Sequence, residues 1–144
     1  MSITVVTGPW AELGAAASAI RQDVFVVEQR VPPELELDEF DAVSLHALAI
    51  DGGTGEALGT GRLLPDGHIG RMAVRRDARG AGIGSMLLRA LMQEARQRGD
   101  TAVVLHAQLP ALGFYQRHGY LPEGAVFMDA GIEHIAMRHT FFPG

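Results

Sequence analysis

Apolar residues recur every three or four positions in two stretches of the chain, the spacing that places them on one face of an α-helix. The first stretch contains Trp10, Leu13, Ala17, Ile20, Val24 and Val27. It ends at Pro32-Pro33, because proline supplies no amide donor and disfavours helix in the residue before it. The second stretch contains Ile83, Leu87, Leu88, Leu91 and Ala95, and Gly99 follows as a C-terminal stop. The pattern therefore predicts two amphipathic helices.

Shorter apolar stretches are typical of β-strands and are separated by turn signals such as Asp51-Gly52-Gly53 and Pro65-Asp66-Gly67. The predicted strands are 3–6, 45–50, 57–64, 68–74, 101–107 and 131–142. A short helix from Pro110 to Gly119 is also expected. The acidic stretch 34–41 is expected to form a loop or irregular turn. No linker or repeat interrupts the chain, so we expect one mixed α/β domain over residues 1–144.

Composition narrows the function classes. The formal net charge of −5 argues against general nucleic-acid binding. The chain has no cysteine, and we expect no metal site because the histidines lack metal-ligand spacing. There is no apolar run of the ~20 residues that span a bilayer and no signal-peptide pattern, so we expect no membrane association and a cytoplasmic location. Four arginines nevertheless cluster locally, at Arg71, Arg75, Arg76 and Arg79.

The glycine-rich loop from Arg79 to Gly84 lies between a predicted strand and a strong helix. Amides at a helix start have no intrahelical partners and suit an anion such as a phosphate. Gly84 is followed by Ser85-Met86, which does not match a P-loop, and the glycine spacing does not match a dinucleotide fold. Gly-x-Ser-x-Gly is absent, so a serine-hydrolase elbow has no support. A glycine-rich turn without a ligand remains the alternative.

Residues 79–84, Arg-Gly-Ala-Gly-Ile-Gly, resemble the Arg/Gln-x-x-Gly-x-Gly/Ala motif of the GCN5-related N-acetyltransferase (GNAT) superfamily. The order of flanking elements is similar too, and "LGFYQRHGY" resembles the second cofactor motif of that superfamily. The stretches "RQDVFVVEQRVPPELELDEFD", "HAQ" and "GIEHIAM" resemble the ElaA-like branch, and the last also resembles glyphosate N-acetyltransferases. The resemblance covers nearly the whole chain. It implies a mixed sheet that opens between its fourth and fifth strands, with helices on both faces, and acetyl-CoA as co-substrate.

The resemblance also implies which residues hold acetyl-CoA. Main-chain amides in the loop and the first helical turn would bind the pyrophosphate, and backbone groups of the preceding strand would pair with the pantetheine arm as an added strand would. An amide near Val74 could polarise the thioester carbonyl. The implied residues are Met72, Ala73, Val74, Arg79, Gly80, Ala81, Gly82, Ile83, Gly84 and Ser85.

Two side chains are expected to move protons. Tyr115 matches the general acid of the superfamily, which donates a proton to the departing thiolate. His134 matches the base of the glyphosate-acetylating relatives, and strand alternation places it on the face of Ile132 and Ala136. For each residue the alternative is a purely structural role, as a packed tyrosine or a hydrogen-bonded core histidine.

The acceptor site is expected on the first helix. Arg21 and Glu28 are seven residues apart and hence near one helical face, and Arg21 matches an arginine that contacts the acidic acceptor in glyphosate enzymes. Glu28 or the acidic run 34–41 could instead attract a cationic amine. We expect a small-molecule amine as the acceptor. A non-catalytic acyl-CoA sensor and acetylation of a protein amine remain alternatives, and assembly as a homodimer is compatible with the sequence.

Overall fold

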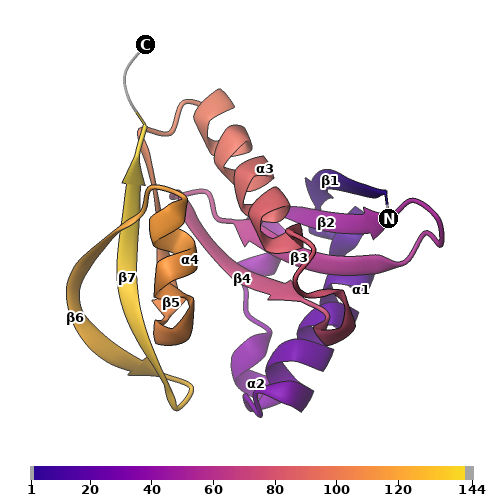
Figure 1. Cartoon of the computed structure of the whole chain (residues 1–144), viewed down its shortest axis with the longest axis horizontal. Helices are drawn as coiled ribbons and strands as arrows, with labels where there is room; N and C mark the ends of the chain where they lie inside the picture. The colour runs from indigo at the N-terminus through magenta and orange to yellow at the C-terminus, as the bar shows by residue number, and fades with distance from the viewer. Residues whose placement is uncertain (1, 142–144) are drawn as a thin grey trace.

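A computed structural model of the chain describes residues 2–141, which form a seven-stranded mixed sheet (Figure 1). Neighbouring strands are antiparallel except β4 and β5, which are parallel. The strands, in their order across the sheet, are β1 (Ile3–Pro9), β2 (Leu45–Asp51), β3 (Ala57–Leu63), β4 (His68–Val74), β5 (Ala102–Gln108), β7 (Ile132–Thr140) and β6 (Leu121–Asp129).

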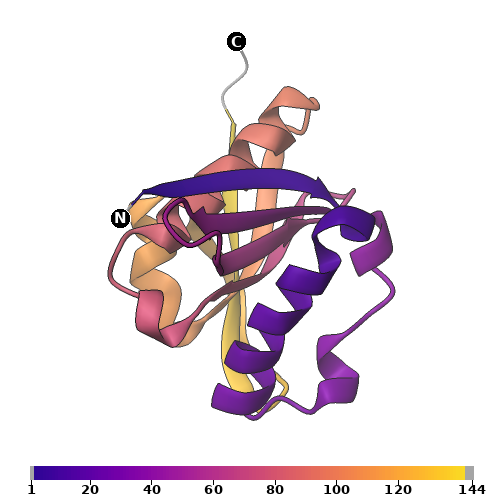
Figure 2. The ribbon, with the colours of Figure 1, turned by 90° about the vertical axis from the view of Figure 1, so that its right-hand side faces the viewer.

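Helices cover both faces of the sheet (Figures 1 and 2). The first helix, α1 (Trp10–Arg21), packs on one face, and α3 (Ile83–Gln97) and the short α4 (Leu112–Arg117) pack on the other. Strand β2 contributes side chains to the hydrophobic cores on both faces of the sheet. Leu48 belongs to the core around α1, and Ala47 and Ala49 belong to the core around α3. The predicted apolar face of α3 is confirmed, since all five of its residues are buried.

The first predicted helix changes form partway. After Arg21 the chain continues as a π-helical segment, Gln22–Glu28. A π-helix takes more residues per turn than an α-helix, so the spacing that buries Ala17, Ile20 and Val24 no longer applies beyond them. Val27 is 66% exposed, so its predicted place on the buried face was wrong.

Two other segments differ from the prediction. Strand β6 was not predicted, because Pro122 and Gly124 interrupt it and its residues are nearly all exposed, which leaves no alternation of buried and exposed positions. The acidic stretch begins with a one-turn helix, α2 (Pro33–Glu36), before its irregular part. The predicted last strand is present as β7, and Phe142, assigned to it from sequence, lies outside the described residues.

Strands β4 and β5 pair only at the start of β4, where His68 lies beside Val104 and Ile69 lies beside Leu105. Beyond these two pairs they diverge, which leaves the β5-facing edge of Gly70–Val74 without a strand partner (Figure 1). The predicted opening between the fourth and fifth strands is confirmed.

A bulge in β4 bends this strand at the opening. Its ladder with β3 is interrupted between Thr60 and Arg62, and Arg71 has a positive φ of 48°, which is uncommon for a residue with a side chain. Opposite the bulge, a Cβ on Gly61 would lie 2.4 Å from Met72 Sδ and 2.9 Å from Leu91 Cδ1, so a larger residue there would displace both side chains. The bulge lets Arg71 and Met72 both line the cavity described below.

No helix among residues 2–141 combines the length and the apolar character needed to cross a lipid bilayer.

Candidate active site

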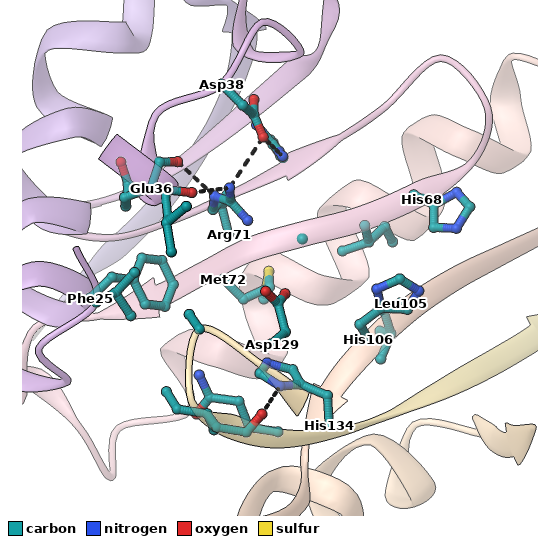
Figure 3. Close-up of a pocket in the computed structure, with 18 of the residues that line it drawn as sticks. Phe25, Glu36, Asp38, His68, Arg71, Met72, Leu105, His106, Asp129 and His134 are labelled. Carbon is teal, nitrogen blue, oxygen red and sulfur yellow. Dashed lines mark hydrogen bonds and ion pairs between the residues drawn. The ribbon is translucent and has the colours of Figure 1, made fainter. Parts of the chain in front are cut away.

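A cavity of about 400 Å³ lies at the opening between β4 and β5 (Figure 3). Its wall combines main-chain and side-chain groups from both strands with residues of α4, of the turn between β6 and β7, and of the segment that connects α1 to β2. Both predicted proton-transfer residues, Tyr115 and His134, line it. Elements distant in sequence therefore meet at the one place where the sheet is open.

Tyr115 reaches the cavity from α4 and is held by aromatic neighbours. Its ring contacts Phe114 edge-on at a centroid distance of 5.0 Å and Tyr120 at 5.9 Å. Burial raises the pKa of the Tyr115 hydroxyl to about 12. The hydroxyl therefore keeps its proton at neutral pH and can donate it.

His134 is buried on β7, and its tautomer follows from its hydrogen bond. Nδ1 lies 2.7 Å from the carbonyl oxygen of Ile132. A carbonyl can only accept, so Nδ1 donates and carries the proton of the neutral imidazole. Nε2 is then left with a lone pair that can accept a proton. The ring of Phe127 stacks on His134 at 5.8 Å and fixes its orientation.

The glycine loop comes directly before α3 and is exposed to solvent. Gly80 and Gly82 have φ values of +88° and +78°, and a Cβ at either would meet no atom within 4 Å. Within α3 the first amide to donate to a carbonyl is that of Met86, to Gly82. The amides of Ile83, Gly84 and Ser85 precede it in the first turn, where an α-helix has no carbonyl for them to bond. This arrangement can accept an anion.

The loop arginine is held by one of the two predicted acceptor residues. Glu28 binds Arg79 through both carboxylate oxygens, at 2.7 and 2.8 Å. The hydrogen bonds that Arg79 donates to Glu28 lower the pKa of Glu28 and raise that of Arg79. Glu28 does not line the cavity. The pair instead fastens the end of the π-helical segment to the glycine loop.

Arg21, the other predicted acceptor residue, is 1% exposed and lies outside the cavity lining. Its guanidinium binds Glu36 and, at 2.7 Å, Asp41, and it lies 5.4 Å from the ring centre of Trp10. Burial alone would lower the pKa of Arg21, but the hydrogen bonds that it donates to Asp41 and Glu36 raise it overall. Because a π-helical segment lies between Arg21 and Glu28, their side chains point in different directions. The expectation that they share one helical face was wrong.

The acidic run therefore supplies internal ion pairs. Asp38 binds Arg62 at 2.6 and 2.8 Å and Arg71 at 3.1 Å, and Asp41 joins Arg62 at 2.9 Å. Arg71 also donates to the main-chain carbonyl of Glu36 at 3.1 Å. We call these three arginines and three carboxylates the ion-pair cluster: Arg21, Arg62, Arg71, Glu36, Asp38 and Asp41. The sequence shows the charges, but their pairing depends on a connection that only the fold defines.

Asp129, His68 and His106 were not among the site residues predicted from the sequence. All three line the cavity (Figure 3). Burial and the nearby His68 lower the pKa of His106, so this imidazole is neutral at neutral pH. Within residues 2–141, no three His, Cys, Asp or Glu side chains are grouped so as to hold a metal ion.

Acid should destabilise the fold. Burial lowers the pKa of His46 from its ordinary 6.5. Asp41 has a pKa below its ordinary 3.8: burial opposes ionisation, but the bonds from Arg21 and Arg62 outweigh it. In both cases the unfolded chain takes up protons at a higher pH than the folded chain does. The free energy of unfolding therefore decreases as the pH is lowered. The His46 contribution is complete above pH 6.5 and is lost below it, and that of Asp41 is lost below pH 3.8.

Urea unfolding across this range measures the effect, and His46→Gln provides the control. Glutamine preserves a donor toward the carbonyl of Asp41, which His46 Nε2 contacts at 2.9 Å, but does not titrate. The variant should show a shallower loss of stability between about pH 7 and pH 5 than the parent chain. Equal slopes would contradict the assignment to His46.

The same architecture and motifs occur in known proteins. A family model described as the acetyltransferase (GNAT) domain matches residues 18–141. YjcF of Bacillus subtilis strain 168, named as an uncharacterized N-acetyltransferase, is 38% identical over 122 residues, which cover 82% of this chain and 86% of YjcF.

Solved structures of other proteins have the same fold as this chain. An acyl-CoA N-acyltransferase from Pseudomonas aeruginosa superposes with a TM-score of 0.86 at 33% identity, covering 96% of this chain and all of that one. ElaA of Escherichia coli superposes with a TM-score of 0.84 at 28% identity, covering 96% of this chain and 99% of ElaA. The resemblance stated from the sequence motifs is thereby confirmed, and the chain belongs to the GNAT acetyltransferase family.

Proposed function

We propose that this protein is an acetyl-CoA-dependent N-acetyltransferase that transfers the acetyl group directly to a small-molecule amine. The observation that carries the proposal is the meeting of Tyr115 and His134 in one cavity at the opening between β4 and β5. A protein that only senses acyl-CoA needs neither a proton donor nor a proton acceptor there.

The residues around the opening fit acetyl-CoA. The amides at the start of α3, with Gly80 and Gly82 open to solvent, suit the pyrophosphate. The edge of Met72, Ala73 and Val74 that faces β5 has no strand partner, so it offers main-chain groups to an extended pantetheine arm. Ser85 is held by His118, with Oγ 2.9 Å from Nε2, which positions the first turn of α3 against α4.

Acetyl-CoA supplies the acetyl group as a thioester. The lone pair on His134 Nε2 accepts the proton that the acceptor nitrogen must lose when its bond to the acetyl carbon forms. The Tyr115 hydroxyl donates a proton to the sulfur as the carbon–sulfur bond breaks. A main-chain amide near Val74 would stabilise the negative charge on the carbonyl oxygen. The products are the amide and the free thiol, and return of the proton from His134 to the Tyr115 oxygen through solvent restores both residues.

Release of free thiol from acetyl-CoA, measured over a broad panel of amines, tests the proposed function. Amine-dependent release with matching N-acetyl product supports it. CoA binding without turnover on any small amine would overturn it in favour of a sensor, and turnover restricted to peptide amines would move the acceptor to proteins.

Gly82→Glu tests the pyrophosphate site. The new carboxylate would lie beside the diphosphate, and we expect the Kd for CoA to rise at least about tenfold in calorimetry. Glutamate at a φ of +78° is also strained, by about 1–2 kcal/mol. Gly55→Glu is the matched control, because Gly55 has a φ of +75°, an equally open Cβ position and the same change in charge. Equal CoA affinity in the two variants would contradict the site.

A further inference from the structure

The charges that line the cavity are unequally compensated. On one side, Glu36, Asp38, Arg62 and Arg71 belong to the ion-pair cluster. The cluster holds three arginines and three carboxylates, so its net charge is zero. Each arginine binds at least one carboxylate directly. Drawing one of them away to bind an acceptor's carboxylate would leave a poorly solvated charge without its partner, which is costly.

On the other side of the cavity, Asp129 is the last residue of β6 and precedes the turn to β7. Ala130 and Gly131 carry the positive φ values that reverse the chain there, 51° and 77°. Within residues 2–141, the Asp129 carboxylate has no hydrogen bond or ion pair, and Figure 3 shows it projecting into the pocket. The nearby His106 does not supply a cation at neutral pH, since burial and the neighbouring His68 lower its pKa. Asp129 is exposed, so it brings to the solvent-accessible wall of the cavity a carboxylate that has no cationic partner among residues 2–141.

The position of Asp129 relative to the base is set by the β6–β7 ladder. Phe127 is the partner of His134, and Asp129 is two residues further along the same face of β6. Such diagonal neighbours are about 7–8 Å apart. A carboxylate stabilises the protonated form of an amine that it binds, whereas the reacting nitrogen must lose its proton. Asp129 therefore suits a second positive group, not the nitrogen that attacks.

We propose that the acceptor is a small amine with a second positive charge, which Asp129 binds while the reacting amine lies at His134. This inference rests on the proposed function. It assigns Asp129 as a specificity-determining residue and replaces the acidic acceptor that the sequence motifs had suggested through Arg21.

Three amines with matched four-carbon chains test the inference: putrescine, butylamine and γ-aminobutyrate end in an ammonium, a methyl and a carboxylate group. We expect kcat/KM for putrescine to exceed that for butylamine about tenfold, the usual scale of one charge-assisted hydrogen bond. Asp129→Asn should remove this preference, so that kcat/KM for putrescine falls to that for butylamine measured with the same variant. Glu133→Gln, an equal change of charge at an exposed residue outside the cavity, is the control and should preserve the preference.

Binding of the three amines to the CoA complex, measured by calorimetry, separates the two proposals. If putrescine binds more tightly than butylamine and loses this advantage in Asp129→Asn, the inference holds even where no thiol is released, and only the transferase proposal fails. If butylamine is acetylated but Asp129→Asn leaves the preference unchanged, the inference is overturned and the transferase stands. Preference for γ-aminobutyrate would overturn it in favour of an acidic acceptor at Arg71.

Discussion

Replacing Tyr115 by phenylalanine should lower kcat about a hundredfold or more, the usual contribution of a positioned general acid. Phenylalanine fills the same aromatic cluster with Phe114 and Tyr120, so the fold and the affinity for acetyl-CoA should be largely preserved. Because burial raises the pKa of Tyr115 to about 12, the donor remains protonated through neutral and mildly alkaline pH. The parent enzyme should therefore lose no activity from this group over that range.

Tyr120→Phe is the matched control. Tyr120 is fully buried beside Tyr115, and its hydroxyl has no hydrogen-bond partner within the described part of the chain. Removing an unpartnered buried hydroxyl is neutral or stabilising. Steady-state kinetics of both variants over a pH series would settle the point: a Tyr115→Phe enzyme as active as Tyr120→Phe would remove Tyr115 from the mechanism.

Replacing Arg21 by methionine should lower the free energy of unfolding by about 3 kcal/mol or more, as expected when one partner of a buried ion pair is removed. Glu36 is 5% exposed and would lose the only side-chain partner that it has within residues 2–141. Asp41 would retain Arg62. The defect is therefore concentrated at Glu36, and adding Glu36→Gln should recover part of the lost stability.

Urea unfolding measures these changes, with Arg138→Met as the control. Arg138 pairs with Glu123 at the surface, where both side chains are nearly half exposed, so its loss should cost at most about 1 kcal/mol. The same variants distinguish a structural Arg21 from an acceptor contact. A direct contact would raise the KM for the amine and leave stability nearly unchanged, which would contradict the role assigned here.

Local patterns predicted the elements whose burial is regular. The apolar face of α3 and the alternating strand β5 have clear periodicity, and the glycine loop has a short motif of fixed spacing. Strand β6 lacks such a signal because nearly all its residues are exposed, so only its pairing with β7 defines it. Motif likeness likewise selected Tyr115 and His134, which both line the cavity and whose catalytic roles stay predictions.

The acceptor side was harder to predict because it depends on long-range placement. The sequence suggests helical continuity between Arg21 and Glu28, whereas the π-helical segment turns one toward Asp41 and the other toward Arg79. The charge of Asp129 is plain in the sequence. Its lack of a partner becomes visible only when all the arginines near the cavity have been paired.

The short seam between β4 and β5 has a mechanical consequence. The four strands β1–β4 on one side and the β5–β7–β6 unit on the other share only two residue pairs of ladder. A molecule lodged in the gap would bridge both units and act as a removable eighth strand. Its binding energy would then add to the cohesion of the whole sheet, so that occupancy and resistance to unfolding rise together.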